Sequence, residues 1–341
     1  MFLNQDKDKL KISSFFAGVG GIDLGFEQTG CFRTAYANEI DPYPVKTFEL
    51  NFDVPADRRD IRQVAPEDVP DVDGYVFGFP CQAFSVAGYR QGFDDEKGRG
   101  NLFFEVMRLV HTKHPRFLLA ENVKNLVGHD GGHTFAVILE ALQAEGYSAQ
   151  YKVLNAMEYG NTPQNRERIY IAAFRNKADC RRFSFPDPVP LTKTLTDIID
   201  FESRMPEKYY YTPGRYKGDI YEQLEEAMDD PGAVYQWRRK YVRKNMSGVV
   251  PTLTANQGEG GHNVCLIKTK YGIRKMTPRE CFNAQGFPKD FALPEDMADS
   301  RLYKQAGNSV CVGVINRIAG QIAKALAHDG SQTVSDRSRQ S

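Results

Sequence analysis

The sequence lacks several features that would assign it to a special class of protein. Its 341 residues carry 44 Lys and Arg against 44 Asp and Glu, so the formal net charge is zero. This balance argues against a protein built wholly to bind polyanions, although it allows a local basic surface. With 41% hydrophobic and 26% charged residues, the composition is typical of a globular protein large enough for two domains.

Cysteines are few and scattered. The six cysteines form no CxxC pair and no Cys/His cluster at zinc spacing. We therefore expect no metal site and a reducing compartment. Residues 1–11 are polar and charged, unlike a secretory signal, and no apolar run approaches the length of a membrane span. These absences predict a cytoplasmic protein with no membrane association.

The stretch GFPCQ at residues 78–82 is a candidate reactive site. It follows a short buried strand predicted over residues 71–77, so Cys81 would lie at the carboxyl end of a strand, where open α/β sheets bind ligands. Pro80 fixes its own φ and keeps the preceding residue extended. The polar, glycine-rich residues 82–100 are typical of a loop that covers a site. A free cysteine is most often a small buried hydrophobe, so Cys81 needs partners before it can be assigned as a nucleophile.

A second candidate site is the glycine-rich turn FAGVGG at residues 16–21, which connects a predicted strand to a predicted helix. Such a turn lets a ligand approach the backbone closely, although a plain tight turn has the same composition. Gly18 and Gly20 fit the start of the dinucleotide-binding pattern G-x-G-x-x-G. Asp23, however, stands where that pattern requires its third glycine, so a dinucleotide fold is not indicated.

Two acidic residues are predicted at the tips of successive strands. Glu39 follows the second strand, 18 residues after Gly21, where it could accept hydrogen bonds from ribose hydroxyls. Asp60 ends a third extended segment and could meet an adenine amino group. Either acid could instead cap a helix or lie on the surface, but the pair favours a nucleoside pocket.

Strands and helices alternate through the first half of the chain. The predicted strands cover residues 11–16, 33–38, 71–77, 116–120, 150–155 and 169–174, and the predicted helices between them cover residues 22–28, 101–111 and 134–144. A further helix, predicted over residues 312–328 near the end of the chain, should pack back on the sheet. This order predicts an α/β fold with a doubly wound, Rossmann-like sheet. Glu121 follows the strand at 116–120, so we expect it at the same sheet edge as Cys81.

The pattern changes after the proline-rich residues 185–190. From there to about residue 265 the chain is polar and aromatic, with no clear βαβ period. It contains the basic run QWRRKYVRK at residues 236–244. A charge run is usually a solvated face, yet aromatic residues interleaved with Arg and Lys suit phosphate and base contacts equally well.

Six motifs, in order over nearly the whole chain, resemble those of the bacterial DNA (cytosine-5) methyltransferases of restriction-modification systems. They are FAGVGG at 16–21, GFPCQ at 78–82, ENV at 121–123, QNRER at 164–168, REC with QGFP at 279–288, and QAGNSV at 305–310. One such motif would be weak, whereas six at the family's spacing are not expected by chance. The catalytic positions show no departure from the family pattern.

The resemblance implies a fold and a division of the chain. The fold would be a Rossmann-like S-adenosylmethionine-dependent methyltransferase sheet with a smaller, irregular target-recognition domain. We expect the catalytic and cofactor-binding domain at residues 1–185 and 301–330, and the recognition domain with its hinge at 186–300. Residues 331–341 would form a disordered tail.

The resemblance also implies a mechanism. Cys81, presented by Pro80, would attack carbon 6 of the target cytosine, so that carbon 5 can accept the methyl group of S-adenosylmethionine. Glu121 would hold ring nitrogen 3 and the exocyclic amine and protonate the ring. Arg168 would contact the cytosine, and Arg166 would organise the site. The target base would be flipped out, because it is unreachable inside a duplex.

Binding residues are implied as well. Donor contacts are expected from Phe16, Gly18, Gly20, Gly21, Glu39, Ile40, Asp60, Ile61, Leu102 and Asn308. Contacts with duplex DNA are expected from Ser85, Arg238, Arg239 and Thr252. We expect a monomer, and a cognate restriction endonuclease, where one exists, would act separately.

Three other functions share part of this pattern. A nicotinamide oxidoreductase would share the sheet but leaves the Pro80-Cys81 pair without a role. A tRNA cytosine-5 methyltransferase would share the motifs, but Phe79 before Pro80 and the basic, aromatic insert favour DNA. A catalytically inactive DNA-binding module is disfavoured by the intact Cys81, Glu121 and Arg168.

Overall fold

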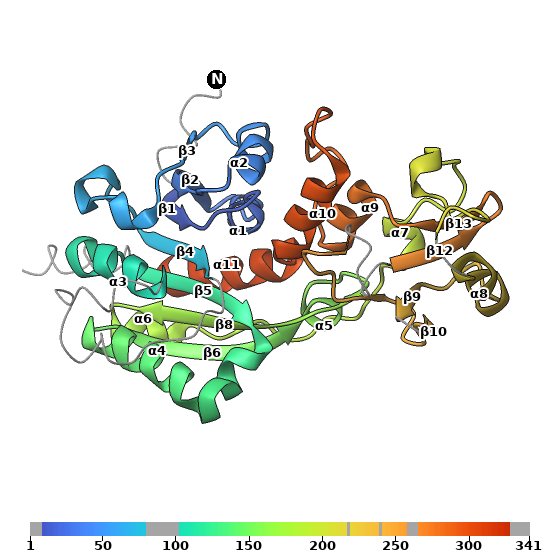
Figure 1. Cartoon of the computed structure of the whole chain (residues 1–341). Coiled ribbons are helices and arrows are strands. Elements are labelled where there is room, and N and C mark those ends of the chain that lie inside the picture. Colours follow the sequence, from blue (N-terminus) through green and yellow to red (C-terminus); the bar gives the residue numbers. More distant parts are fainter. Residues whose placement is uncertain (1–8, 80–101, 217–218, 239–240, 258–264, 328–341) are drawn as a thin grey trace, which may run out of the picture.

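The computed structural model describes residues 9–79, 102–216, 219–238, 241–257 and 265–327. Its centre is a seven-stranded sheet with the strand order β3-β2-β1-β4-β5-β8-β6 (Figure 1). The strands are β1 (Leu10–Phe15), β2 (Phe32–Asn38), β3 (Ala56–Asp57), β4 (Gly74–Gly78), β5 (Phe117–Val123), β6 (Ser148–Asn155) and β8 (Glu167–Phe174). The first five strands in this order, β3, β2, β1, β4 and β5, are parallel to one another, whereas β8 runs antiparallel to both β5 and β6.

Helices cover both faces of this sheet, as a doubly wound fold requires. On one face lie α1 (Gly21–Glu27), α5 (Ala156–Tyr159), α6 (Lys177–Arg182) and α11 (Val312–Leu326), and on the other lie α3 (Leu102–Lys113) and α4 (His133–Ala144). The sequence of strand β4 is continuously apolar because both of its faces are covered. Val76 faces the first helix layer, and Tyr75 and Phe77 face the second. The predicted fold class is confirmed.

The predicted elements lie within a few residues of the observed ones, with two differences that matter for the site. Strand β5 continues through Glu121 to Val123, because β8 pairs with it as far as Arg168. Strand β3 has two residues, and Asp60 instead caps a short 3₁₀ helix, η1 (Ile61–Gln63), by accepting a hydrogen bond from the Arg62 amide. The placement of Asp60 at a strand tip is therefore wrong, and the alternative of a helix cap is correct.

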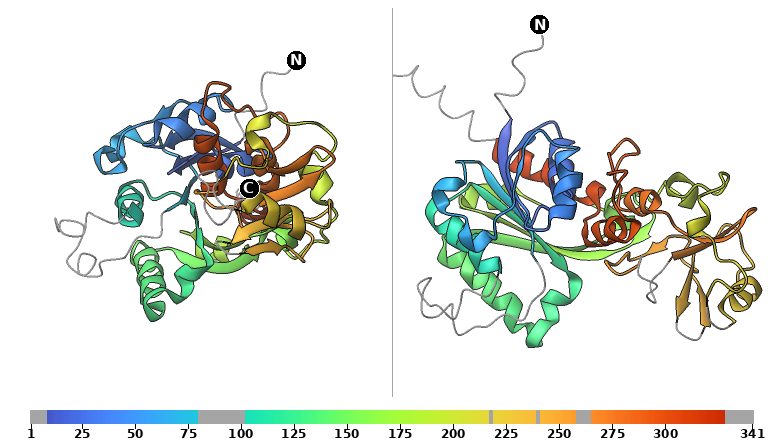
Figure 2. Two further views of the ribbon diagram at one scale, coloured as in Figure 1. Left: turned by 45° about the vertical axis from the view of Figure 1, so that its right-hand side comes forward. Right: turned by 45° about the horizontal axis from the view of Figure 1, so that its top comes forward.

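The segment after residue 186 contains more regular structure than its sequence pattern indicated. A four-stranded antiparallel sheet has the order β10-β9-β12-β13 and lies at the right of Figure 1 and of the right-hand view in Figure 2. Its strands are β9 (Tyr235–Arg238), β10 (Tyr241–Lys244), β12 (Cys265–Thr269) and β13 (Gly272–Lys275). Helix α8 (Ile220–Ala227) packs Leu224 against Tyr235 and Leu266 of this sheet, which gives it a small core of its own.

Short elements connect the two sheets. Strand β11 (Val250–Pro251) pairs in parallel with β7 (Gln164–Asn165), which directly precedes β8. The remaining elements are α2 (Pro42–Glu49), α7 (Leu195–Ile198), α9 (Pro278–Ala284), α10 (Asp299–Asn308), η2 (Pro66–Asp68), η4 (Lys124–Gly132) and η5 (Glu207–Tyr209). Within the described ranges, none of the helices is long and apolar enough to cross a membrane.

Candidate active site

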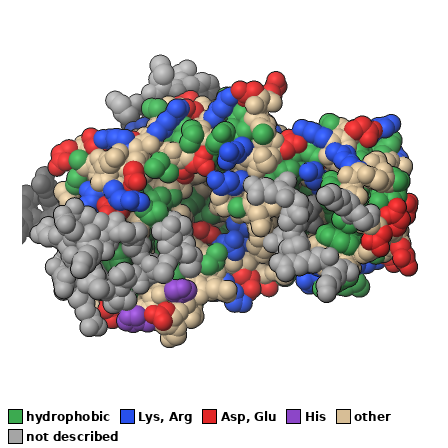
Figure 3. Space-filling view, in the orientation of Figure 1, with side chains coloured by type: hydrophobic (Ala, Val, Ile, Leu, Met, Phe, Trp, Pro, Cys, Tyr) green, Lys and Arg blue, Asp and Glu red, His purple; other side chains and the backbone are tan. Residues whose placement is uncertain are grey.

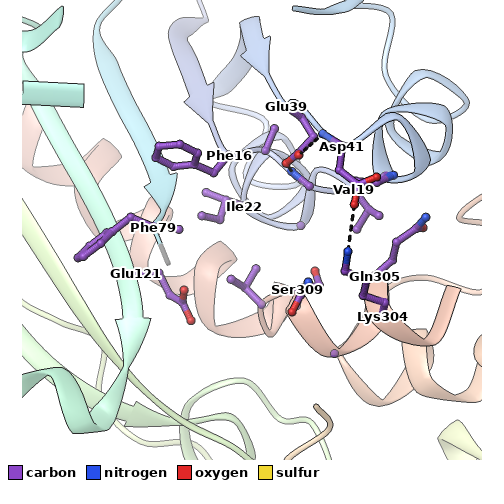
Figure 4. Close-up of a pocket in the computed structure, with 18 of the residues that line it drawn as sticks. Phe16, Val19, Ile22, Glu39, Asp41, Phe79, Glu121, Lys304, Gln305 and Ser309 are labelled. Atoms are coloured by element: carbon purple, nitrogen blue, oxygen red, sulfur yellow. Dashed lines mark hydrogen bonds and ion pairs between the residues drawn. The ribbon is translucent and has the colours of Figure 1, made fainter. Parts of the chain in front are cut away.

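A pocket of about 380 Å³ opens at the carboxyl ends of β1, β2, β4 and β5. In Figure 4, Glu39 and Asp41 lie at its top, Phe79 and Glu121 at its left, and Lys304 and Gln305 of α10 at its right. This is the sheet edge at which open α/β folds bind ligands. Eight of the residues predicted to bind donor or cytosine line it: Phe16, Gly18, Gly21, Glu39, Glu121, Arg166, Arg168 and Asn308.

The glycine-rich loop and Glu39 are built as one unit. Gly20 caps α1 with a φ of 83°, a conformation that favours glycine, and a Cβ there would lie 2.2 Å from the Phe52 ring. The Gly18 amide donates to Glu39 Oε2 at 2.9 Å, and the Asp41 amide donates to Oε1 at 2.8 Å. Because a carboxylate oxygen has further acceptor capacity, Glu39 can still accept bonds from two vicinal hydroxyls. Burial raises the pKa of Glu39, and the two amide bonds oppose that rise.

Asp23 replaces the third glycine of a dinucleotide loop for a structural reason. Its carboxyl group is fully buried under the loop and accepts hydrogen bonds from Ser14 Oγ at 2.9 Å and Thr34 Oγ1 at 3.1 Å. These bonds connect β1, α1 and β2. Burial raises the pKa of Asp23 to about 7, and the two hydroxyl bonds limit that rise.

Glu121 and Arg168 face each other on adjacent strands. The Arg168 Nε lies 3.1 Å from Glu121 Oε1, and Glu121 is 9% exposed. Burial raises the pKa of Glu121, while the positive charges of Arg168 and Arg166 lower it. A carboxyl group with a raised pKa can exist as the acid and donate a proton, so this pair suits general acid catalysis. The carboxylate of the neighbouring Glu167 pairs instead with Lys124 at 2.9 Å.

Arg166 is buried between two separate parts of the chain. Its Nη1 donates to Leu253 O at 2.9 Å, and its Nη2 donates to Gly307 O at 3.2 Å and Ser309 O at 2.5 Å. Burial lowers the pKa of Arg166 to about 10, which leaves it charged at neutral pH. With all three bonds made to backbone carbonyl groups, Arg166 organises the pocket wall.

Other predicted residues lie elsewhere. Gly20, Ile40, Asp60, Ile61 and Leu102 are not part of the pocket wall; Ile40 is 60% exposed, whereas Ile61 is buried in the core. Pro80, Cys81, Ser85 and Arg239 lie outside the described residues. The Asn122 Nδ2 donates to Phe79 O at 2.8 Å, which fixes the backbone just before Pro80.

Sequence reasoning missed several residues of the pocket wall. They are Asp41, Tyr43, Arg301, Lys304 and Gln305. Figure 4 shows Asp41, Lys304 and Gln305 at the end of the pocket away from Glu121. Asp41 follows Glu39 by two residues and Gln305 begins the motif at 305–310, so their positions could have been inferred. Tyr43, Arg301 and Lys304 meet only because α2 and α10 are packed together, with Lys304 Nζ 3.2 Å from Asp41 Oδ2 and Arg301 over the Tyr43 ring.

A second, larger cleft adjoins the pocket. It measures about 800 Å³, lies between the two sheets and shares Val123 and Arg168 with the pocket. The cations Lys124, Arg168, Arg238, Arg243 and Lys244 line it together with Thr252. Figure 3 shows Lys and Arg side chains around the hollow at the middle of the molecule. The cleft therefore combines positive charge with a wall residue, Arg168, that it shares with the pocket.

Comparison with known proteins decides the family. The model of the C-5 cytosine-specific DNA methylase family matches residues 10–324. The chain belongs to this family. This chain is 58% identical over 317 residues to the type II methyltransferase M.Bsp6I of Bacillus sp. (strain RFL6), a match that covers 93% of this chain and 99% of the relative. It is 38% identical to M.SsoII of Shigella sonnei over 95% of this chain and 82% of that protein.

Solved structures share the fold of this DNA methylase. The crystal structure of the Dnmt2 methyltransferase of S. pombe matches with a TM-score of 0.69 at 16% identity, covering 94% of this chain and 98% of that chain. The overall fold is thus shared by proteins of very different sequence. The predicted resemblance to the DNA (cytosine-5) methyltransferases is confirmed, and the protein is a DNA methyltransferase that acts at carbon 5 of cytosine.

Proposed function

We propose that the methyl group comes from S-adenosylmethionine and goes to a flipped-out cytosine in duplex DNA. The observation that carries this proposal is that a single pocket runs from Glu39 to Glu121 and opens through Arg168 into the basic cleft. A donor with a ribose fits the Glu39 end, and a base delivered from a duplex in the cleft fits the Glu121 end. S-adenosylmethionine with a labelled methyl group should therefore transfer the label to duplex DNA. Duplex DNA that acquires no label would contradict the proposal.

The donor end of the pocket has the groups that a nucleoside with an amino-acid tail requires. When bound, S-adenosylmethionine supplies an electrophilic methyl group on a sulfonium. Glu39 would accept from its ribose hydroxyls, and Phe16 would contact its adenine. We also propose donor contacts from Gly18, Gly21 and Asn308, which line the pocket. Donor contacts from Gly20, Ile40, Asp60, Ile61 and Leu102, which lie outside the pocket wall, stay predictions from the family resemblance.

Removing the Glu39 carboxylate should weaken donor binding selectively. Glu39→Ala is expected to cost about 1–3 kcal/mol of donor affinity, because hydrogen bonds from the donor to a charged group are lost. Calorimetric titration with S-adenosylmethionine measures this, and duplex binding without the donor should change little. Glu49→Ala is the matched control, since Glu49 pairs with Arg58 outside the pocket. Unchanged donor affinity for Glu39→Ala would contradict the assigned ribose site.

At the cytosine end we propose one role for each motif residue. Cys81, held by Pro80, attacks carbon 6, and Glu121 contacts ring nitrogen 3 and the exocyclic amine and protonates the ring as carbon 5 becomes nucleophilic. Arg168 contacts the cytosine and stabilises the charge that develops on it. Arg166 keeps Leu253, Gly307 and Ser309 in place around these groups.

The basic cleft would bind the duplex, and residues 186–300 would contain the recognition domain. We propose contacts from Arg238 and Thr252 in the cleft wall and from Arg239 and Ser85. Phosphate contacts release counterions, each adding roughly 0.9 to the slope of log affinity against log salt. The double variant Arg238→Gln with Arg239→Gln should therefore reduce that slope.

The slope is measured by duplex binding at several salt concentrations. Lys177→Gln with Arg181→Gln is the matched control, because both residues are exposed on α6 and lie outside the cleft wall. An unchanged slope in the Arg238 and Arg239 variant would show that these cations only form a solvated face.

The choice of nucleic acid follows from the relatives. M.Bsp6I and M.SsoII, both named type II methyltransferases, are 58% and 38% identical to this chain. This similarity favours duplex DNA over the tRNA alternative. We propose that the protein works as a monomer in a restriction-modification system, with a separate endonuclease that cuts the same unmethylated sequence. Assaying methyl transfer to tRNA beside duplex DNA tests the alternative directly.

A further inference from the structure

Leu253 lies between two residues of the basic cleft wall and is hydrogen-bonded on both of its peptide groups. The Leu253 amide donates to Gln164 Oε1 at 3.2 Å, and the Leu253 carbonyl accepts from Arg166 Nη1 at 2.9 Å. Leu253, Gln164 and Arg166 are all buried. On the cleft side, Thr252 and Thr254 line the wall. Leu253, between these two threonines, is thus held at its N–H by Gln164 and at its C=O by Arg166.

Gln164 extends this contact to the donor side. Its Nε2 donates to Ala284 O at 2.5 Å and to Gln285 Oε1 at 3.2 Å, and Gln285 Nε2 donates to Ala306 O at 2.7 Å. Gln164 and Gln285 are both fully buried. Because Ala306 directly precedes Gly307, Asn308 and Ser309 of the pocket wall, the chain of bonds ends at the donor site.

The two backbones also touch directly. A Cβ placed on Gly307 would lie 2.2 Å from the Thr254 carbonyl carbon, so any other residue would force the segment of Thr252 to Thr254 away. Arg166 Nη2 donates a hydrogen bond to the Gly307 carbonyl, next to this backbone contact. A displacement of the cleft segment must therefore break buried bonds or move the donor wall with it.

We propose that Gln164 is a positioning residue that couples donor binding to DNA binding. It lines neither the pocket nor the cleft, but it holds Leu253 between the threonines of the cleft wall and, through Gln285, the Ala306 carbonyl next to the donor wall. A change in the position of one wall is therefore transmitted to the other. This inference rests on the proposed function, since it requires a donor in the pocket and a duplex in the cleft. Coupling is reciprocal, so DNA must tighten the donor by the same factor as the donor tightens DNA.

The test compares two dissociation constants of S-adenosylhomocysteine, with and without a saturating duplex that carries a mapped methylation site. The wild-type ratio should be at least about fivefold, the lower end of ordinary coupling. Gln164→Met keeps the side-chain volume and removes its hydrogen bonds, and its ratio should fall close to one. Its dissociation constant without DNA should stay within about twofold of the wild-type value, because Gln164 is outside the donor pocket. A purely structural role would lower the melting temperature and leave the ratio unchanged.

Gly307→Ala provides a second variant that should also lose coupling, and Gly320→Ala is its matched control. Gly320 lies on α11 with no atom within 4 Å of an added Cβ, so its ratio should equal that of the wild type.

Hydrogen exchange needs no variant: S-adenosylhomocysteine alone should slow exchange at the Leu253 amide, which lines no part of the donor pocket. A wild-type ratio of one, an unchanged ratio in Gln164→Met, or unaltered Leu253 exchange would overturn the coupling while methyl transfer to DNA stands. A wild type that neither binds S-adenosylhomocysteine nor methylates DNA would overturn the proposed function itself.

Discussion

A duplex with 5-fluorocytosine at the target position should trap the wild-type protein covalently, and Cys81→Ser should trap none. If Cys81 attacks carbon 6, the hydrogen on carbon 5 must leave after methyl transfer to release the protein. Fluorine cannot leave as a cation, so the adduct persists. A serine hydroxyl is a far weaker nucleophile than a thiol at neutral pH, so the variant should form no adduct.

The measurement is a denaturing gel that counts adducts per target site. The adduct should require S-adenosylmethionine, and Cys81→Ser should still bind the unmodified duplex. Cys281→Ser and Cys311→Ser are useful controls, because both thiols are buried and burial raises the pKa of each. A thiol with a raised pKa is a poor thiolate source. An adduct that survives in Cys81→Ser, or that maps to Cys281 or Cys311, would overturn the assignment of the nucleophile.

Glu121→Gln should lower kcat by about 10²–10⁴, the range for loss of a general acid. The amide keeps the size of the side chain but cannot protonate ring nitrogen 3. Duplex binding should change much less than kcat, because the basic cleft is unaltered. The pH profile gives a second measurement. Since burial raises the pKa of Glu121, the acid form survives to higher pH, and activity should decline as pH rises through that pKa. The Gln variant should lack this decline.

Glu105→Gln is the matched control for Glu121→Gln. Glu105 is also a buried carboxylate paired with an arginine, with its Oε2 3.0 Å from Arg108 Nε, but it lies on α3 outside the pocket wall. The control should retain kcat even if it is less stable. Equal losses of kcat in both variants would show that Glu121 acts through the fold and not through proton transfer.

The candidate site was predictable where its residues follow a strand. Glu39 and Glu121 could be placed at the sheet edge because a parallel strand determines where the next side chains must lie. Asp60 could not be placed in this way, because an acidic residue after a short extended segment suits a strand tip and a helix cap equally well. In the structure it caps η1 by accepting a hydrogen bond from the Arg62 amide. Tyr43, Arg301 and Lys304 were missed because they come from helices that are distant in sequence and adjacent only in space.

The sequence by itself determined the alternation of strands and helices, the loop at residues 16–21 and the family motifs, because each depends on residues that are close along the chain. Tertiary structure alone decided that β8 runs against its neighbours, which brings the Arg168 side chain to 3.1 Å from the Glu121 carboxylate. It also decided that Leu253 is held between Gln164 and Arg166, 87 or more residues away. No local pattern encodes such contacts, because they form only when separate segments bury their polar groups against one another.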